Sequence, residues 1–266
     1  MKKYAFFLDI DGTILYYDEK IKNEIIPKRV IESIKNARNE GHFVYINTGR
    51  APSYFDQKIW DLPVDGFLCG CGAYAIDANR TVLFQAAYPN EALLRWTKKL
   101  SNPEDPGLIV EGVNKIFRLR ETYWKPREGW ILSDDPKDLE EYLKHDSVVK
   151  MNLCQDIDTA ILPDLQKDFD VIHHPAEHYT ECCIPGCSKS EGMKRILALH
   201  GMDLSQCVAM GDSENDLDMI CTAGIGVAMG QAYEEVRNAA DFVTDSVWDA
   251  GAATAIDRII TGDRYG

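Results

Sequence analysis

The chain begins with a regular alternation of short apolar runs and amphipathic stretches. The runs 4–8, 43–46 and 66–69 are apolar and short, which is typical of buried strands. Between them, 27–41 carries apolar residues at helical spacing between a proline and a glycine, and 53–60 is a second helix candidate. This alternation of strands and helices predicts a parallel sheet with crossover helices.

The pattern changes after about residue 84 and resumes near residue 190. The middle third mixes helix-like and strand-like segments in an order that suits an α+β module. Beyond it, helices alternate with the strand-like runs 206–210 and 224–229. We therefore predict an α/β fold: a Rossmann-like three-layer core with a mostly parallel sheet, plus an inserted α+β domain. The discontinuous core would comprise 1–84 and 185–266, and the insertion 85–184.

Composition and charge narrow the class of function. With 29 Lys and Arg against 43 Asp and Glu, the formal net charge is −14, which disfavours binding to nucleic acid. The chain has no apolar stretch of the about 18 residues that a membrane span needs, and its N-terminal apolar run is too short for a signal peptide. We expect a cytoplasmic monomer or homodimer whose 8 cysteines are reduced thiols without a structural metal.

Polar residues follow three of the predicted strands. Asp9 and Asp11 follow the first, Thr48-Gly49 follows the second, and the loop 211–216 follows the strand at 206–210. Ligands of open parallel sheets bind beyond the carboxyl ends of the strands, so the three clusters should meet at one edge. Taken singly, the first cluster is often a turn after a strand, and the second is almost uninformative. The acidic loop over 212–216 is also typical of a helix cap.

These residue types together indicate phosphoryl chemistry. Asp9, Asp11 and Asp212 offer the oxygen ligands that suit Mg²⁺ with a bound phosphate. One carboxylate can attack phosphorus, and the second can donate a proton to the leaving oxygen and later activate water. Thr48 and the amide of Gly49 can donate hydrogen bonds to phosphoryl oxygens. Lys189, just before a predicted helix, is our candidate for the balancing cation.

The segments 6–15, 46–50 and 211–216, together with Lys189, closely resemble the four motifs of the haloacid dehalogenase-like superfamily. The segment 227–230, with Ala240-Asp241 and Gly251 beyond it, resembles its Cof-type sugar-phosphatase branch. That branch carries a large α/β cap (type IIB) where this chain has its insertion, so the insertion would select the substrate.

The resemblance implies a role for each matching residue. Asp9 would be the nucleophile and a metal ligand, and Asp11 the general acid and base with its carbonyl on the metal. The remaining roles are a third metal ligand at Asp212, a brace for the metal site at Asp216, and phosphate contacts from Ile10, Thr48, Gly49, Lys189 and Asn215. An Asp two positions after the nucleophile implies phosphatase or mutase chemistry rather than dehalogenation.

Three residues depart from the motifs of this family. Asn47 stands where a small residue is usual, Cys71 replaces the Asn of Asn-Gly-Ala, and Gln231 replaces the Asn of Met-Gly-Asn-Ala. None of them removes a charge from the catalytic set. Cys71 would alter the mouth of the site, which bears on substrate preference more than on activity.

Two features of the insertion have alternative interpretations. His173, His174 and His178 could bind a transition metal, but we expect them to face solvent. The segment 115–127 interleaves basic and aromatic residues, and it is either an exposed strand face or a substrate-binding surface. In the second case, Arg118 and Arg120 would contact the substrate when the cap closes.

We interpret the chain as a Mg²⁺-dependent phosphatase for a small phosphorylated metabolite, acting through an aspartyl-phosphate. The resemblance implies a phosphorylated sugar, while flavin-precursor and pyridoxal phosphates remain open. The alternatives are a sugar phosphomutase, and a non-catalytic sensor of phosphorylated ligands.

Overall fold

The computed structural model describes residues 2–100, 102, 105–122, 124–154, 157, 159–174 and 178–262. The chain divides into two compact units. The first comprises Met1–Gly49, Gln57–Phe84 and Ser188–Gly266, and the second Arg50–Asp56 and Gln85–Cys187. Residues 50–56 and 185–187 thus pack with the second unit, whereas we assigned them to the core.

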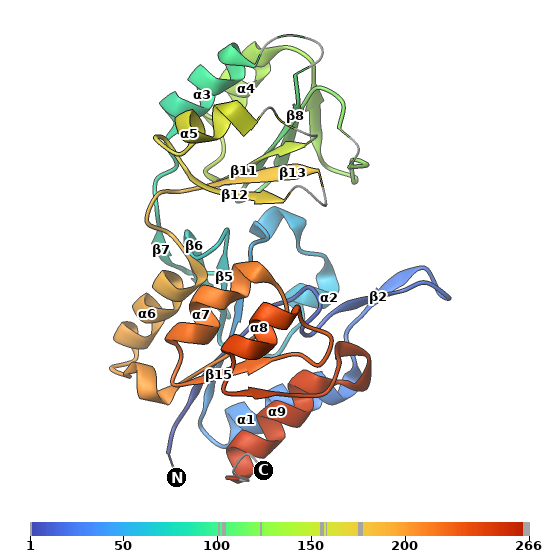
Figure 1. The fold of residues 1–266 in the computed structure, drawn as a ribbon, viewed down its shortest axis with the longest axis vertical. Helices are drawn as coiled ribbons and strands as arrows, with labels where there is room; N and C mark the ends of the chain where they lie inside the picture. The colour runs from blue at the N-terminus through green and yellow to red at the C-terminus, as the bar shows by residue number, and fades with distance from the viewer. Residues whose placement is uncertain are drawn as a thin grey trace. The chain divides into compact units, whose positions relative to one another are not determined.

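The first unit is built on an eight-stranded sheet (Figure 1). Parallel pairing joins the strands from β16 to β5, and β6 is antiparallel to β5. Their order across the sheet is β16 (Phe242–Val243), β15 (Ile225–Ala228), β14 (Cys207–Gly211), β1 (Ala5–Leu8), β4 (Phe43–Asn47), β5 (Gly66–Cys69), β6 (Tyr74–Asp77) and β7 (Val82–Gln85). A short hairpin of β2 (Tyr16–Asp18) and β3 (Asn23–Ile25) follows β1.

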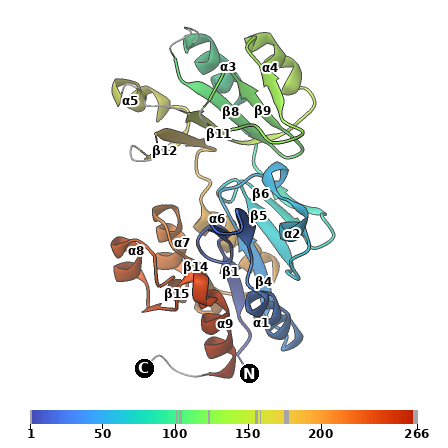
Figure 2. The same cartoon turned by 90° about the vertical axis from the view of Figure 1, so that its right-hand side faces the viewer.

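Helices cover both faces of this sheet. Phe7 packs with Met193 and Ile196 of α6 (Lys189–Leu199) and with Met219 of α7 (Leu217–Thr222), while α8 (Glu234–Ala239) lies beside α7. The helices α1 (Lys28–Asn39) and α9 (Gly251–Thr261) pack together on the other face (Figure 2). The predicted α/β fold with a three-layer core is confirmed.

The predicted helix over 53–60 is wrong as a single element. A 3₁₀ turn over Pro52–Tyr54 and the short helix α2 (Gln57–Trp60) are separated by Phe55, whose backbone is extended. The Ala51 amide donates to Glu111 at 3.2 Å, and the Ser53 hydroxyl donates to the Gly112 carbonyl at 2.6 Å. Contacts with the sheet of the second unit therefore override the local helical pattern.

The second unit is an α+β domain with a six-stranded sheet. Its pairs are antiparallel except β9 with β10. The order is β10 (Ile131–Ser133), β9 (Ile116–Leu119), β8 (Gly107–Gly112), β11 (Val148–Cys154), β13 (Tyr179–Cys183) and β12 (Asp170–His174). The helices α3 (Asn90–Lys99), α4 (Pro136–Tyr142) and α5 (Leu162–Leu165) lie together on one side of this sheet (Figures 1 and 2).

All eight cysteines are free thiols, and Cys221 alone of the eight is exposed. Among the helices of the described ranges, none has both the length and the hydropathy needed to cross a bilayer.

Candidate active site

The carboxyl ends of three adjacent strands bring the predicted polar clusters together. β1 lies between β4 and β14, in parallel with both, and the amide of Asp9 donates to the carbonyl of Met210 at 3.0 Å. Asp9 and Asp11 follow β1, Thr48 and Gly49 follow β4, and Asp212 follows β14. The expected meeting of these residues at one sheet edge follows directly from the strand order.

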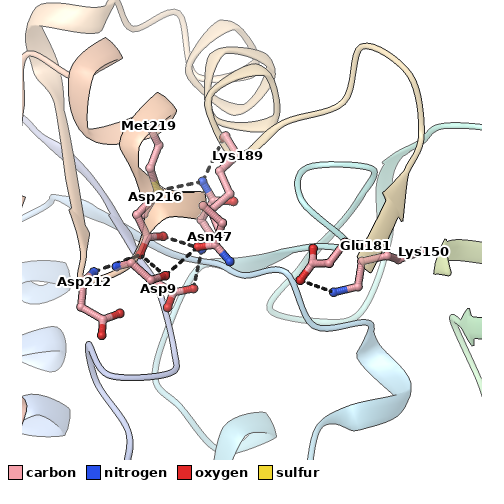
Figure 3. A network of polar contacts seen from close by, with 10 residues as sticks. Asp9, Asn47, Lys150, Glu181, Lys189, Asp212, Asp216 and Met219 are labelled. Carbon is pink, nitrogen blue, oxygen red and sulfur yellow. Dashed lines mark hydrogen bonds and ion pairs between the residues drawn. The ribbon is translucent and has the colours of Figure 1, made fainter. Parts of the chain in front are cut away.

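Lys189 lies at the centre of the carboxylates (Figure 3). Its ammonium donates to Asp216 at 2.5 Å, to Asp9 at 2.7 Å and to the side-chain oxygen of Asn215 at 3.1 Å, and the residue is 1% exposed. Burial by itself would lower the pKa of Lys189, but the carboxylates of Asp216 and Asp9 raise it above its usual value. The lysine is therefore a permanent buried cation.

Asp216 is fully buried and serves as the structural brace of this edge. Its Oδ2 accepts hydrogen bonds from the amides of Asp212 and Ser213 at 2.9 and 3.1 Å, while its Oδ1 accepts from Lys189. Because these donors already occupy both oxygens, Asp216 suits a bracing role better than that of a metal ligand.

The negative charge of the Asp212 carboxylate is only partly compensated by its surroundings. Its Oδ1 is buried without a hydrogen-bond partner among the described residues. Burial and the nearby charge of Asp216 raise the pKa of Asp212 to about 7, and burial likewise raises the pKa of Asp9. One oxygen each of Asp9, Asp212 and Asp216 lies within 4.8 Å of the others, with one lysine to balance three carboxylates. A divalent cation held by Asp9 and Asp212 would offset this surplus, so the donor set fits Mg²⁺.

Position 12 requires a glycine, because the loop after β1 passes close to the Asp212 side chain. Its φ is +74°, and a Cβ at this position would overlap the Asp212 carboxylate. We predict that Gly12→Ala lowers the free energy of unfolding by about 1–3 kcal/mol and reduces activity, because Asp212 must move. Urea unfolding and turnover measurements test this.

Gly41→Ala is the matched control for that substitution. Gly41 has a φ of +88° but nothing within 4 Å of an added Cβ, so its replacement adds backbone strain alone. Equal losses of stability and activity in the two variants would contradict a specific role for the contact between Gly12 and Asp212.

The remaining predicted residues line the same edge. Asp11 is exposed, and Ile10 and Thr48 are buried. The amide of Thr48 donates to the Leu68 carbonyl at 2.9 Å, which holds the residue at the end of β4. Asn215 accepts hydrogen bonds from Lys189 and Ser213 through its oxygen, so its amide group is oriented by that anchoring. The catalytic and phosphate-binding roles of these residues stay predictions.

Asn47 is a bracing residue whose role sequence reasoning missed. It is fully buried at the end of β4, and its amide donates to the carbonyl of Lys189 at 3.0 Å and to Met219 Sδ at 3.4 Å (Figure 3). It thus holds the first residue of α6, which carries the buried ammonium. The sequence did contain one indication of this role, since a polar residue stands here at the end of an apolar strand where the family usually has a small one.

In the second unit, a buried ionic network lies on one face of the sheet. The ammonium of Lys150 is 3.5 Å from both Glu111 and Glu181 (Figure 3). Asn152 donates to Glu111 at 2.5 Å. Burial raises the pKa of Glu111, against the opposing effect of Lys150.

The two arginines predicted to contact substrate lie in and after β9. Arg118 is paired with Ile109 of β8, and its Nε has no hydrogen-bond partner in the part of the chain described. Arg120 has a left-handed backbone with a φ of +66° and donates to the Pro106 carbonyl at 2.7 Å. Contact of either residue with substrate stays a prediction.

The histidines of this unit do not share one face. His173 and His174 are neighbours in β12, so their side chains point to opposite faces of the strand. His173 is hydrogen-bonded to Thr180 at 2.8 Å, and the ring of His174 stacks on Tyr179. Both are half-buried and only His178 of the three is exposed, so the expectation that all three face solvent is wrong for two of them.

Comparisons with known proteins agree with the arrangement. Residues 6–256 match the family described as haloacid dehalogenase-like hydrolase. The Bacillus subtilis protein YcsE, named as a 5-amino-6-(5-phospho-D-ribitylamino)uracil phosphatase, is 28% identical over 94% of this chain and 92% of its own length. Among solved structures, the phosphatase BT1666 from Bacteroides thetaiotaomicron matches with a TM-score of 0.79 and 26% identity, over 96% of this chain and 94% of that one.

A second solved structure has the same fold at lower identity. The subclass IIB sugar phosphatase BT4131 matches with a TM-score of 0.75 and 24% identity, over 97% of this chain and 99% of its own. The family match over residues 6–256 confirms the resemblance seen in the motifs. The chain belongs to the haloacid dehalogenase-like hydrolases, and it is a phosphatase of that family.

Proposed function

We propose that the protein hydrolyses small phosphorylated sugars or sugar alcohols in a Mg²⁺-dependent reaction with Asp9 as the nucleophile. The observation that carries this proposal is the arrangement of charges at the sheet edge. One buried ammonium bridges Asp9 and Asp216, and the Asp212 carboxylate beside them has a buried oxygen without a partner among the described residues. Such an edge is suited to a cation and a phosphoryl group together.

Asp9, Asp212 and the main-chain carbonyl of Asp11 would hold the metal ion. Their oxygens are the hard ligands that Mg²⁺ prefers, usually completed by water and substrate phosphate. When bound, the ion supplies charge neutralisation between the Asp9 carboxylate and the anionic phosphoryl group. Lys189 supplies a second positive charge that is fixed by the fold.

In the first half of the reaction, a carboxylate oxygen of Asp9 attacks phosphorus while the bond to the substrate oxygen breaks. Asp11 donates a proton to that leaving oxygen, so the free alcohol departs. The phosphoryl oxygens would be held by the amides of Ile10 and Gly49, the Thr48 hydroxyl, Lys189 and the amide group of Asn215.

In the second half, water attacks the phosphorus of the Asp9 phosphoenzyme. Asp11, now a carboxylate, accepts a proton from that water, and the bond between phosphorus and Asp9 breaks. Inorganic phosphate leaves, and both aspartates return to their starting states. Asp11 is exposed, which allows it to exchange protons with solvent and substrate.

The relatives support a polyhydroxylated substrate. YcsE is named as the phosphatase of a phosphorylated ribityl compound, and BT4131 is named as a sugar phosphatase. We propose that residues 85–184 act as the cap that selects the leaving group. We also propose that the protein acts in the cytoplasm, where its eight cysteines would stay reduced.

The test is phosphate release from a panel of sugar, sugar-alcohol and cofactor monophosphates, with Mg²⁺ or with a chelator. We expect turnover that is lost with the chelator and returns when Mg²⁺ is added in excess. Turnover that is unchanged in the chelator would contradict the metal requirement. Phosphoryl transfer to a second sugar, dependent on a bisphosphate activator, would identify a mutase instead.

A further inference from the structure

Gln231 connects three parts of the first unit through its side chain. Its Nε2 donates to the carbonyl of Gly12 at 2.5 Å, and its Oε1 accepts a hydrogen bond from the amide of Val247 at 2.9 Å. Gly12 follows Asp11 in the loop after β1, and Val247 begins the 3₁₀ turn that precedes α9. A single half-buried side chain therefore ties the loop of the nucleophile to a distant segment of the chain.

The same segment also holds Asp212. The amide of Tyr233 donates to the main-chain carbonyl of Asp212 at 3.1 Å. The backbone around Gln231 is itself fixed, because Gly230 donates to Asp245 and Met229 donates to Gly211, each at 3.0 Å. Gln231 thus has a rigid base from which to orient the loop and the carboxylate.

The length of the side chain matters for this arrangement. Asparagine, the residue found here in the Cof-type motif, is shorter by one methylene, about 1.5 Å of reach. From the same backbone position, we expect it to contact at most one of the Gly12 carbonyl and the Val247 amide. Gly12 and Asp212 are in close contact, so a shift of the loop would also displace the carboxylate.

We propose that Gln231 is a positioning residue that fixes Gly12 and Asp212 in the geometry needed for the divalent cation. The inference rests on the proposed function, since it takes Asp212 as a metal ligand. Residues that orient metal ligands typically contribute 10- to 100-fold to metal affinity or activity, so we expect an effect of about that size.

The test uses Gln231→Met, which keeps the length and loses both hydrogen bonds, and Gln231→Asn, which keeps at most one of the two. Mn²⁺ affinity is measured without substrate from the electron paramagnetic resonance signal of free Mn²⁺, and the half-saturating Mg²⁺ concentration is measured from turnover. We expect the Mn²⁺ dissociation constant to rise about 10- to 100-fold in Gln231→Met and less in Gln231→Asn. Circular dichroism should show an unchanged fold.

Gln57→Met is the matched control, because Gln57 is an exposed glutamine of the same unit, bonded to Asp61 at 2.7 Å. Its Mn²⁺ affinity should equal that of the wild type. An unchanged Mn²⁺ affinity in Gln231→Met, or wild-type affinity in Gln231→Asn, would overturn the inference.

Asp212→Asn separates this inference from the proposed function. If Asp212→Asn weakens Mn²⁺ binding and Gln231→Met does not, the metal site stands and the positioning role fails. If Asp212→Asn leaves Mn²⁺ binding unchanged, the proposed metal site itself fails, and the inference fails with it.

Discussion

Asp9→Asn is expected to lower kcat by about four orders of magnitude or more while the protein remains folded. An amide oxygen is a poor nucleophile, so the covalent step has no replacement at this position. The side-chain oxygen of asparagine can still accept the hydrogen bond that Lys189 now donates to Asp9 at 2.7 Å. The substitution therefore removes the proposed nucleophile with little change in packing.

Two measurements check this prediction. Phosphate release gives kcat, and mass spectrometry of acid-quenched protein detects a covalent phosphoryl group, which the wild type should carry and the variant should lack. Asp257→Asn is the control, since Asp257 is a partly exposed carboxylate of α9 that pairs with Arg29 at 3.4 Å. If Asp9→Asn retains turnover or still forms the adduct, a different residue is the nucleophile.

The meeting of the three polar clusters could be predicted from the sequence for a simple physical reason. Each cluster follows a short apolar run, and the carboxyl ends of parallel strands share one edge whatever their separation along the chain. The structure places β1 between β4 and β14, which makes Asp9, Thr48 and Asp212 neighbours. The hydrophobic pattern of the sequence was therefore enough to predict which residues meet at the ends of the strands.

The supporting residues could not be predicted in the same way. Asn47 and Gln231 act through hydrogen bonds to backbone groups 142 and 219 positions away, and no local pattern encodes such a partner. The predicted helix over 53–60 was wrong for the same reason. Glu111 and Gly112 accept hydrogen bonds from Ala51 and Ser53, and these contacts hold the backbone in a non-helical conformation. Each of these residues departs from a family motif or from its local propensity. Such departures are the only indication in a sequence that a residue makes a tertiary contact of this kind.

Lys189→Met should have the largest effect on stability as well as on turnover. The side chain is 1% exposed, and its ammonium compensates Asp9 and Asp216, which are 5% and 0% exposed. Removal of one partner from a buried charge network leaves the others without compensation. We expect the free energy of unfolding to fall by about 3–5 kcal/mol and turnover to be lost. Methionine is close to lysine in length and apolar, so the loss reports the charge rather than a cavity.

Denaturant unfolding in the presence of a chelator measures this effect, because no divalent cation can then replace the missing ammonium. Lys194→Met is the matched control on the same helix. Lys194 is exposed and pairs with Glu191 at 2.6 Å, and such surface pairs contribute about 0–1 kcal/mol. A small loss in both variants would mean that Asp9 and Asp216 are compensated without Lys189, and the charge arrangement on which the proposed function rests would then be wrong. A large loss confined to Lys189→Met would establish that the fold itself depends on the cation that we propose binds phosphate, so that stability and the proposed catalysis share one residue.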